Sequence, residues 1–72
     1  MDDIRDLQEA ISASPDNVPL RRLLADKLLA AGRYLEAEIE LKQAVGLAPT
    51  DPRLKVSLAE AFAAQDKTSL GL

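Results

Sequence analysis

Few side chains in this 72-residue sequence are suited to acid–base or nucleophilic chemistry. The sequence contains no His and no Cys, so its serines have no imidazole to act as a general base. The usual ligands of transition metals are missing for the same reason, and so is a Gly-rich phosphate-binding loop. The sequence therefore predicts no catalytic residues, no metal site, no cofactor and no enzyme activity. The serines in question are Ser12, Ser14, Ser57 and Ser69.

Two groups of charged residues, one acidic and one basic, could also indicate a function. Asp2, Asp3 and Asp6 crowd the start of the first expected helix, where a catalytic carboxylate cluster is one interpretation. The favoured one is that these acids complement the positive end of the helix dipole on a solvated face.

Arg21 and Arg22 are adjacent, but the net charge is −3. Because nucleic-acid binding needs a basic face, we expect no nucleic-acid partner.

The apolar residues indicate neither a membrane segment nor a leader. The longest wholly apolar runs are four residues, too short to cross a bilayer. The acidic start, MDDIRD, does not resemble a signal peptide. We therefore expect no membrane partner and a cytoplasmic location.

Apolar residues recur at helical spacing in four segments, which predicts helices over 2–13, 18–31, 34–47 and 52–65. No alternating run of β-branched residues predicts a strand. The helix-forming faces are expected to contain Ile4, Leu7, Ala10 and Ile11; Leu20, Leu23, Leu24 and Leu28; Ala37, Leu41, Ala44 and Val45; and Leu54, Leu58, Ala59 and Phe62.

Turn signals separate these segments near 14–17, 32–33 and 48–51. Asp16 and Asn17 are both suitable N-caps for the second helix, and Asp51 for the fourth, with Pro19 and Pro52 in the first helical turns that follow. Gly32 is suited to the left-handed conformation that ends a helix. The sequence thus predicts four helices in consecutive antiparallel pairs.

An internal repeat becomes visible when the chain is shifted by 34 residues. Seven of the 38 aligned pairs are identical, which alone is only suggestive. The matches are nevertheless structural markers in the right order, because buried Leu, small Ala and terminating Pro coincide. A fixed period of this size is typical of stacked helical repeats. The identical pairs are Leu7/Leu41, Ala10/Ala44, Pro15/Pro49, Leu20/Leu54, Leu24/Leu58, Ala25/Ala59 and Ala30/Ala64.

With this period the chain resembles the tetratricopeptide repeat (TPR) family. The resemblance implies an all-α fold of antiparallel helical hairpins, a fragment of a right-handed superhelix with about four helices. It places one complete unit at 18–51 and partial units at 1–17 and 52–72 of a single domain. One interpretation is that the domain is an excerpt of a longer chain. The residues that carry it are Leu24, Ala25, Leu28, Gly32, Tyr34, Ala37, Leu41, Ala44 and Pro49.

Two residues depart from the family pattern. Arg21 stands where a large apolar residue is usual, so Leu20 is expected to fill that role. Asp66 stands where the second copy should have the counterpart of Gly32. Because Asp adopts the left-handed conformation less readily, we expect a looser turn there.

The family resemblance implies a binding face along the first helix of each unit and a protein or peptide as partner. The alternative is a solvated face of mixed charge. Asp26 would repel a peptide C-terminal carboxylate, so a carboxylate clamp is not expected. The candidate partner-binding residues are Arg22, Asp26, Leu29, Arg53, Ser57 and Glu60.

Four aliphatic residues are candidates for self-association. Leu35 and Ile39 are neighbours on the third helix, opposite its expected buried face, although scattered exposed apolar residues are also common. Leu70 and Leu72 fall where a further helix would begin. They could contact a following repeat of a longer chain or a second copy in a weak homodimer.

These observations predict a protein–protein interaction scaffold without catalysis of its own. The alternative is an adaptor or regulatory segment of a larger multidomain enzyme, such as a bacterial ATPase.

Overall fold

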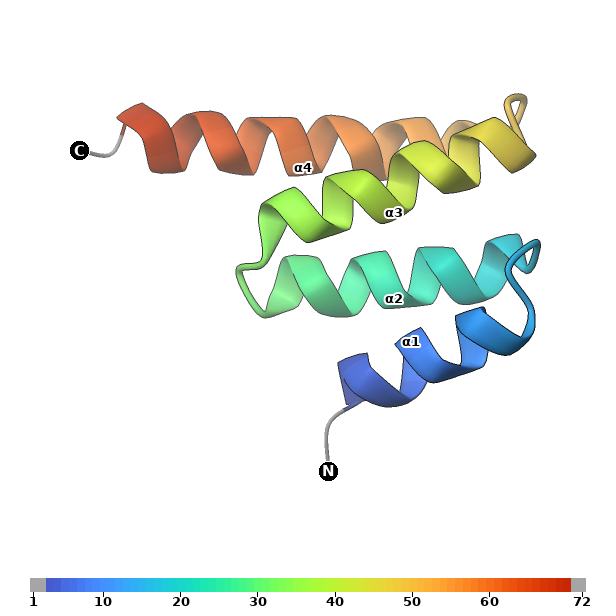
Figure 1. The fold of residues 1–72 in the computed structure, drawn as a ribbon. Helices are drawn as coiled ribbons and strands as arrows, with labels where there is room; N and C mark the ends of the chain where they lie inside the picture. The colour runs from blue at the N-terminus through green and yellow to red at the C-terminus, as the bar shows by residue number, and fades with distance from the viewer. Residues whose placement is uncertain (1–2, 71–72) are drawn as a thin grey trace.

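The computed structural model describes the backbone of residues 3–70 and the side chains of residues 3–65. It contains four helices: α1 (Asp3–Ala13), α2 (Val18–Ala30), α3 (Tyr34–Leu47) and α4 (Pro52–Leu70). Successive helices run in opposite directions and stack one on the next (Figure 1). No strand occurs within the described range. The predicted all-helical fold of consecutive antiparallel pairs is therefore confirmed.

The second helix is bounded at both ends by local hydrogen bonds. Asn17 is its N-cap, and the Asn17 Oδ1 accepts a hydrogen bond from the Leu20 backbone N–H at 3.1 Å. At the other end Gly32 has a φ of +77°, the left-handed conformation that Gly adopts without steric cost. The Gly32 N–H donates to the Leu29 carbonyl and the Arg33 N–H to the Leu28 carbonyl. This pair of bonds is a Schellman motif, so Gly32 ends α2 as expected.

The fourth helix is longer than the sequence predicts. It begins at Pro52, and the Asp51 Oδ1 accepts a hydrogen bond from the Arg53 backbone N–H at 3.0 Å. It then continues through Asp66 to Leu70, so the expected end at residue 65 and the looser turn at Asp66 are wrong. The reason is that residues 66–70 contain neither Gly nor Pro, and Asp alone does not stop a helix.

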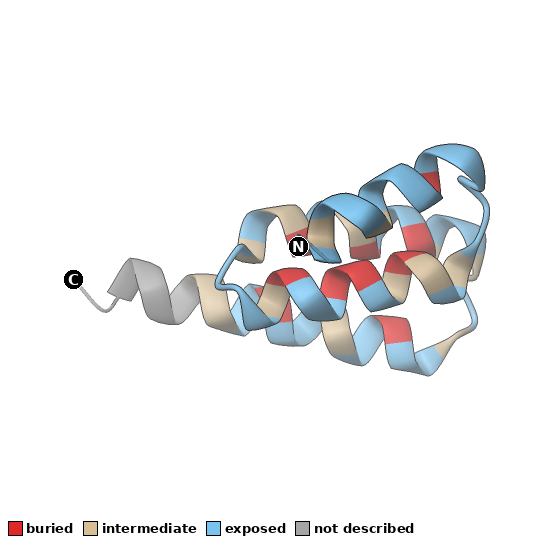
Figure 2. Cartoon of the chain, turned by 90° about the horizontal axis from the view of Figure 1, so that it is seen from below, coloured by how far each residue is buried: buried red, intermediate tan, exposed pale blue. Residues whose placement is uncertain are grey.

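Two clusters of buried side chains hold the helices together, and α2 and α3 contribute to both. The first joins α1, α2 and α3, and the second joins α2, α3 and α4. The small residues Ala25 and Ala37 are completely buried, as their place at the α2–α3 contact requires. Figure 2 shows that the inner helices carry most of the buried positions. The clusters contain Ile11, Leu24, Leu28 and Ala37, and Ala25, Leu41, Ala44, Leu54 and Ala61.

The buried face of α4 differs from the expected one. Leu54 and Ala61 are completely buried and Leu58 is half-buried, whereas Ala59 and Phe62 are exposed. The reason is that α4 packs against α3 and touches α2, but no described helix covers its other side. Leu23 is likewise exposed, although the periodicity placed it in the apolar stripe of α2.

Arg21 also departs from expectation. Only 8% of the residue is exposed, so Arg21 itself occupies the buried place that we assigned to Leu20. Leu20 is half-buried and packs against the first cluster. The Arg21 Nε donates to the Pro15 carbonyl at 2.8 Å, and the Arg21 Nη1 lies 2.9 Å from the Glu40 Oε2. A charged side chain is stable in this place because its charge is paired and hydrogen-bonded.

Candidate ligand-binding groove

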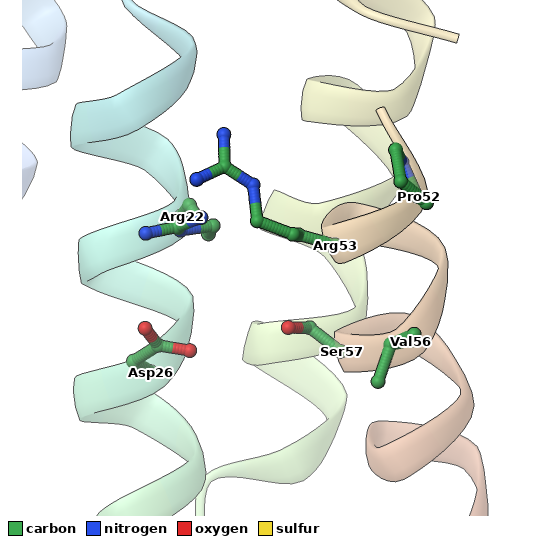
Figure 3. A pocket seen from close by; sticks show the side chains of 6 residues that line it. All are labelled: Arg22, Asp26, Pro52, Arg53, Val56 and Ser57. Atoms are coloured by element: carbon green, nitrogen blue, oxygen red, sulfur yellow. The ribbon is translucent and has the colours of Figure 1, made fainter. Parts of the chain in front are cut away.

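A hollow lies between α2 and α4, and we call it the α2–α4 groove. It has a volume of about 350 Å³. The two helices contact each other only slightly, because α3 lies between them (Figure 1). Residues of both helices line the hollow (Figure 3): Arg22 and Asp26 from α2, and Pro52, Arg53, Val56 and Ser57 from α4.

Helical spacing positions the polar side chains of the groove. Arg22 and Asp26 are four residues apart on α2, and Arg53 and Ser57 are four residues apart on α4. Residues at this spacing lie one turn apart on the same face of a helix. Arg22 and Arg53 therefore lie at one end, and Asp26 and Ser57 face each other one turn farther along (Figure 3).

The charges at the arginine end are only partly compensated. The Arg53 Nε lies 3.4 Å from the Asp51 Oδ1, and the Arg53 side chain is 71% exposed. The Arg53 hydrogen bonds lower the pKa of Asp51, and the charge of Arg22 lowers it further. The side chains of Arg22 and Asp26 form no hydrogen bond or ion pair with any other described residue. Arg22 could therefore bind an acidic group of a ligand, and Asp26 could accept a hydrogen bond from a donor on it.

A second, smaller hollow of about 150 Å³ continues from the arginine end. Arg22 and Arg53 line both hollows. The remaining lining residues of the smaller hollow are Val18, Pro19 and Asp51.

The groove brings together four of the six candidate partner-binding residues: Arg22, Asp26, Arg53 and Ser57. Leu29 is half-buried and packs against both core clusters, and Glu60 is exposed outside the groove lining.

Sequence reasoning missed Pro52 and Val56 as lining residues. The repeat contained the signal for Val56, because a shift of 34 residues places it on Arg22.

A comparison with protein-family models finds the model described as "Tetratricopeptide repeat" over residues 4–65. The chain belongs to the tetratricopeptide repeat family. The comparisons with curated proteins and with solved structures find no match to it. Membership gives this TPR chain the broad role of a protein–protein interaction scaffold.

The candidate self-association residues of the TPR chain lie elsewhere. Leu35 and Ile39 are 62% and 48% exposed on α3. Ile39 lines a separate hollow of about 180 Å³ together with Gln8, Leu28, Glu36 and Glu40. Leu70 is the last residue of α4, but its side chain and the whole of Leu72 fall outside the described residues.

The described part of the TPR chain contains neither a candidate metal site nor a candidate membrane-spanning helix. Over residues 3–65 no three His, Cys, Asp or Glu side chains are grouped so that they could hold a metal ion. None of the helices that the structure describes has the length and apolar character needed to cross a membrane.

Proposed function

We propose that this chain binds an extended peptide segment of a partner protein in the α2–α4 groove. The observation that carries the proposal is the half-buried Arg22, which lines the groove and whose side chain forms no hydrogen bond or ion pair with a described residue. A solvent-facing cation beside a second one, Arg53, favours a carboxylate-bearing side chain as its ligand.

The spacing of the groove charges suggests the pattern of the ligand. Arg22 and Asp26 are separated by four residues of helix, a rise of about 6 Å. An extended peptide rises about 3.3 Å per residue and directs every second side chain to the same side. An acidic residue opposite Arg22 would therefore be followed, two residues away, by a basic residue opposite Asp26.

The apolar part of the groove supports a peptide rather than a small ion. Val56 is 59% exposed, and Pro52 is exposed beside it. An apolar side chain of the ligand could cover both, with a gain of about 25 cal/mol per Å² buried. Pockets of this kind combine apolar contact with a few polar groups that fix orientation.

The proposed role is binding without catalysis. The groove is lined by Arg, Asp, Ser, Pro and Val, and no His or Cys exists in the sequence to activate Ser57.

Fluorescence anisotropy with short labelled peptides tests the proposal. The probe is an otherwise neutral peptide with the pattern Glu-Leu-Lys, and the comparison peptides carry Glu-Leu-Glu or Lys-Leu-Lys. We expect the mixed-charge peptide to bind most tightly. Arg22→Gln should weaken its binding by about tenfold, the loss of one charge-assisted hydrogen bond.

Lys27→Gln is the matched control, because Lys27 is exposed on the same helix but does not line the groove. Equal weakening by Lys27→Gln and Arg22→Gln would show a general charge effect and contradict the proposed site. So would equal affinity for all three peptides.

A further inference from the structure

The two outer helices each carry a face that the described helices cover only in part, and the repeat relates these faces to buried ones. The α1 face consists of Asp3, Asp6, Leu7 and Ala10, and the α4 face consists of Lys55, Leu58, Ala59 and Phe62. Leu7 and Leu58, at the inner edges of these faces, already pack against the core clusters. A shift of 34 residues places the α1 face on Ala37, Glu40, Leu41 and Ala44 of α3. The same shift places the α4 face on Arg21, Leu24, Ala25 and Leu28 of α2.

Burial differs sharply between the equivalent positions. Leu41 and Ala44 are completely buried, whereas Leu7 is half-buried and Ala10 is exposed. For the α4 face, Phe62 is 44% exposed, whereas its equivalent on α2, Leu28, is 1% exposed. Ala25 is completely buried, and its equivalent Ala59 is exposed.

The inner pair α2 and α3 explains this difference, because these two helices bury each other. By the repeat, α4 is equivalent to α2 but has no described α3-like helix against it. The first helix, α1, is equivalent to α3 but has no described α2-like helix against it. The two open faces are thus complementary halves of one repeat unit.

We propose that the α4 face of one molecule receives the α1 face of a second copy, in the register that α2 and α3 adopt within the chain. This head-to-tail contact joins different surfaces of the two molecules, so it is heterologous and can add further copies at both ends. It goes beyond the proposed function, because it does not use Arg22 or Asp26 of the α2–α4 groove.

Charge complementarity favours a second copy as the occupant. Within the chain the Arg21 Nη1 lies 2.9 Å from the Glu40 Oε2. The repeat equivalents of these two residues are Lys55 and Asp6, which again have opposite charges. Both are exposed in the single chain. In the proposed register Lys55 of one copy meets Asp6 of the other, in the place of the internal pair.

The apolar positions also match in this register. Phe62 takes the place of Leu28, and its ring already has the Lys42 Nζ 5.6 Å from its centroid on the α3 side. Its other side would meet the incoming helix. Leu7 and Ala10 have the same residue types as Leu41 and Ala44. Burial of these side chains is the driving force of the contact.

One position in the register is unfavourable. Asp3 takes the place of the completely buried Ala37, which packs with Leu24 and Leu28. Bringing a carboxylate towards their equivalents, Leu58 and Phe62, opposes association. The contact is therefore expected to be weak, and Asp3→Ala should strengthen it.

Sedimentation velocity over a concentration series from micromolar to millimolar tests the proposal, with two charge-reversed variants. Asp6→Lys and Lys55→Glu each place like charges at the junction and should weaken association by about tenfold. In an equimolar mixture every junction between the two variants again joins opposite charges, so alternating association should return. Both positions are exposed, so circular dichroism should show the helix content of the wild type.

The apolar contact has its own matched pair of variants. Phe62→Ser should abolish association, and Phe62→Leu should retain it because Leu is the residue at the equivalent buried position 28. Arg22→Gln should leave association unchanged, which separates this test from that of the groove.

Three results would overturn the proposal. The first is a wild-type monomer throughout the concentration series. The second is association that neither charge reversal weakens. The third is a mixture of Asp6→Lys and Lys55→Glu that associates no better than either variant alone.

Discussion

Arg21 on α2 and Glu40 on α3 form an ion pair with a distance of 2.9 Å between the Arg21 Nη1 and the Glu40 Oε2. Their side chains are only 10% and 20% exposed. The Arg21 Nε also donates to the Pro15 carbonyl in the turn between α1 and α2. One side chain thus connects three successive elements of the chain.

Removing one partner of this pair should destabilise the fold. Arg21→Ala leaves the Glu40 carboxylate and the Pro15 carbonyl without this partner, so we expect a loss of about 2 kcal/mol in the free energy of unfolding. The double variant Arg21→Ala/Glu40→Ala should lose less than the sum of the two single losses, because the charges are coupled. Urea denaturation measures all three. Strict additivity would contradict the coupling.

The small residues between α2 and α3 should not tolerate enlargement. Ala25→Leu or Ala37→Leu should reduce the free energy of unfolding by about 1–3 kcal/mol through overpacking, since both residues are completely buried. Leu41→Ala should cost about 2–5 kcal/mol by leaving a cavity. Ala30→Leu is the matched control, because Ala30 is exposed at the end of α2. If chemical denaturation gave Ala37→Leu the same midpoint as the wild type, this result would contradict a tight contact at Ala37.

Two glycines should respond in opposite directions to the same change. A Cβ at either Gly32 or Gly46 would meet no heavy atom within 4 Å, so steric contact does not distinguish them. Gly32 has a φ of +77°, and Gly32→Ala should destabilise by about 1 kcal/mol because Ala disfavours this conformation. Gly46 lies within α3, and Gly46→Ala should stabilise by about 0.5 kcal/mol. Thermal denaturation of both variants tests the contrast, and shifts of the same sign would refute it.

The fold should lose stability as the pH falls below about 4.5. Hydrogen bonds to neighbouring cations lower the pKa of Glu36, Glu38 and Asp51 from their usual values of 4.5, 4.5 and 3.8. The unfolded chain therefore takes up these protons first, so the stabilisation is complete above the unfolded pKa values and is lost as the pH falls through the folded ones.

Urea midpoints between pH 7 and pH 3 should show this decline, and Glu38→Gln should make it shallower. Glu38 accepts hydrogen bonds from both Lys42 and Gln65, the first of which contributes most to lowering its pKa. Glu60→Gln is the control for the loss of one negative charge, because Glu60 is exposed and has no ion-pair partner among the described residues. An unchanged midpoint from pH 7 to pH 3 would contradict the prediction.

Local signals in the sequence determined the helices and most of their ends. Tyr34–Leu47 and the start of α4 at Pro52 agree with the predicted bounds, because Gly32 and Asp51 act on neighbouring backbone groups. The 34-residue period also identified the family and the hairpin arrangement, since a repeated unit must bury the same face in each copy.

Only the tertiary structure decided which side of each helix is covered. Leu28 and Phe62 have equivalent places in the repeat, yet one is buried and the other exposed, because burial depends on whether a neighbouring helix is present. The ion pair of Arg21 with Glu40 joins residues 19 positions apart, and no helical periodicity links them. The groove likewise needs α2 and α4 to be held on either side of α3, so Val56 became a lining residue only when the helices were packed. Helix periodicity is a local property, whereas burial, ion pairing and grooves arise from contacts between segments distant in the sequence.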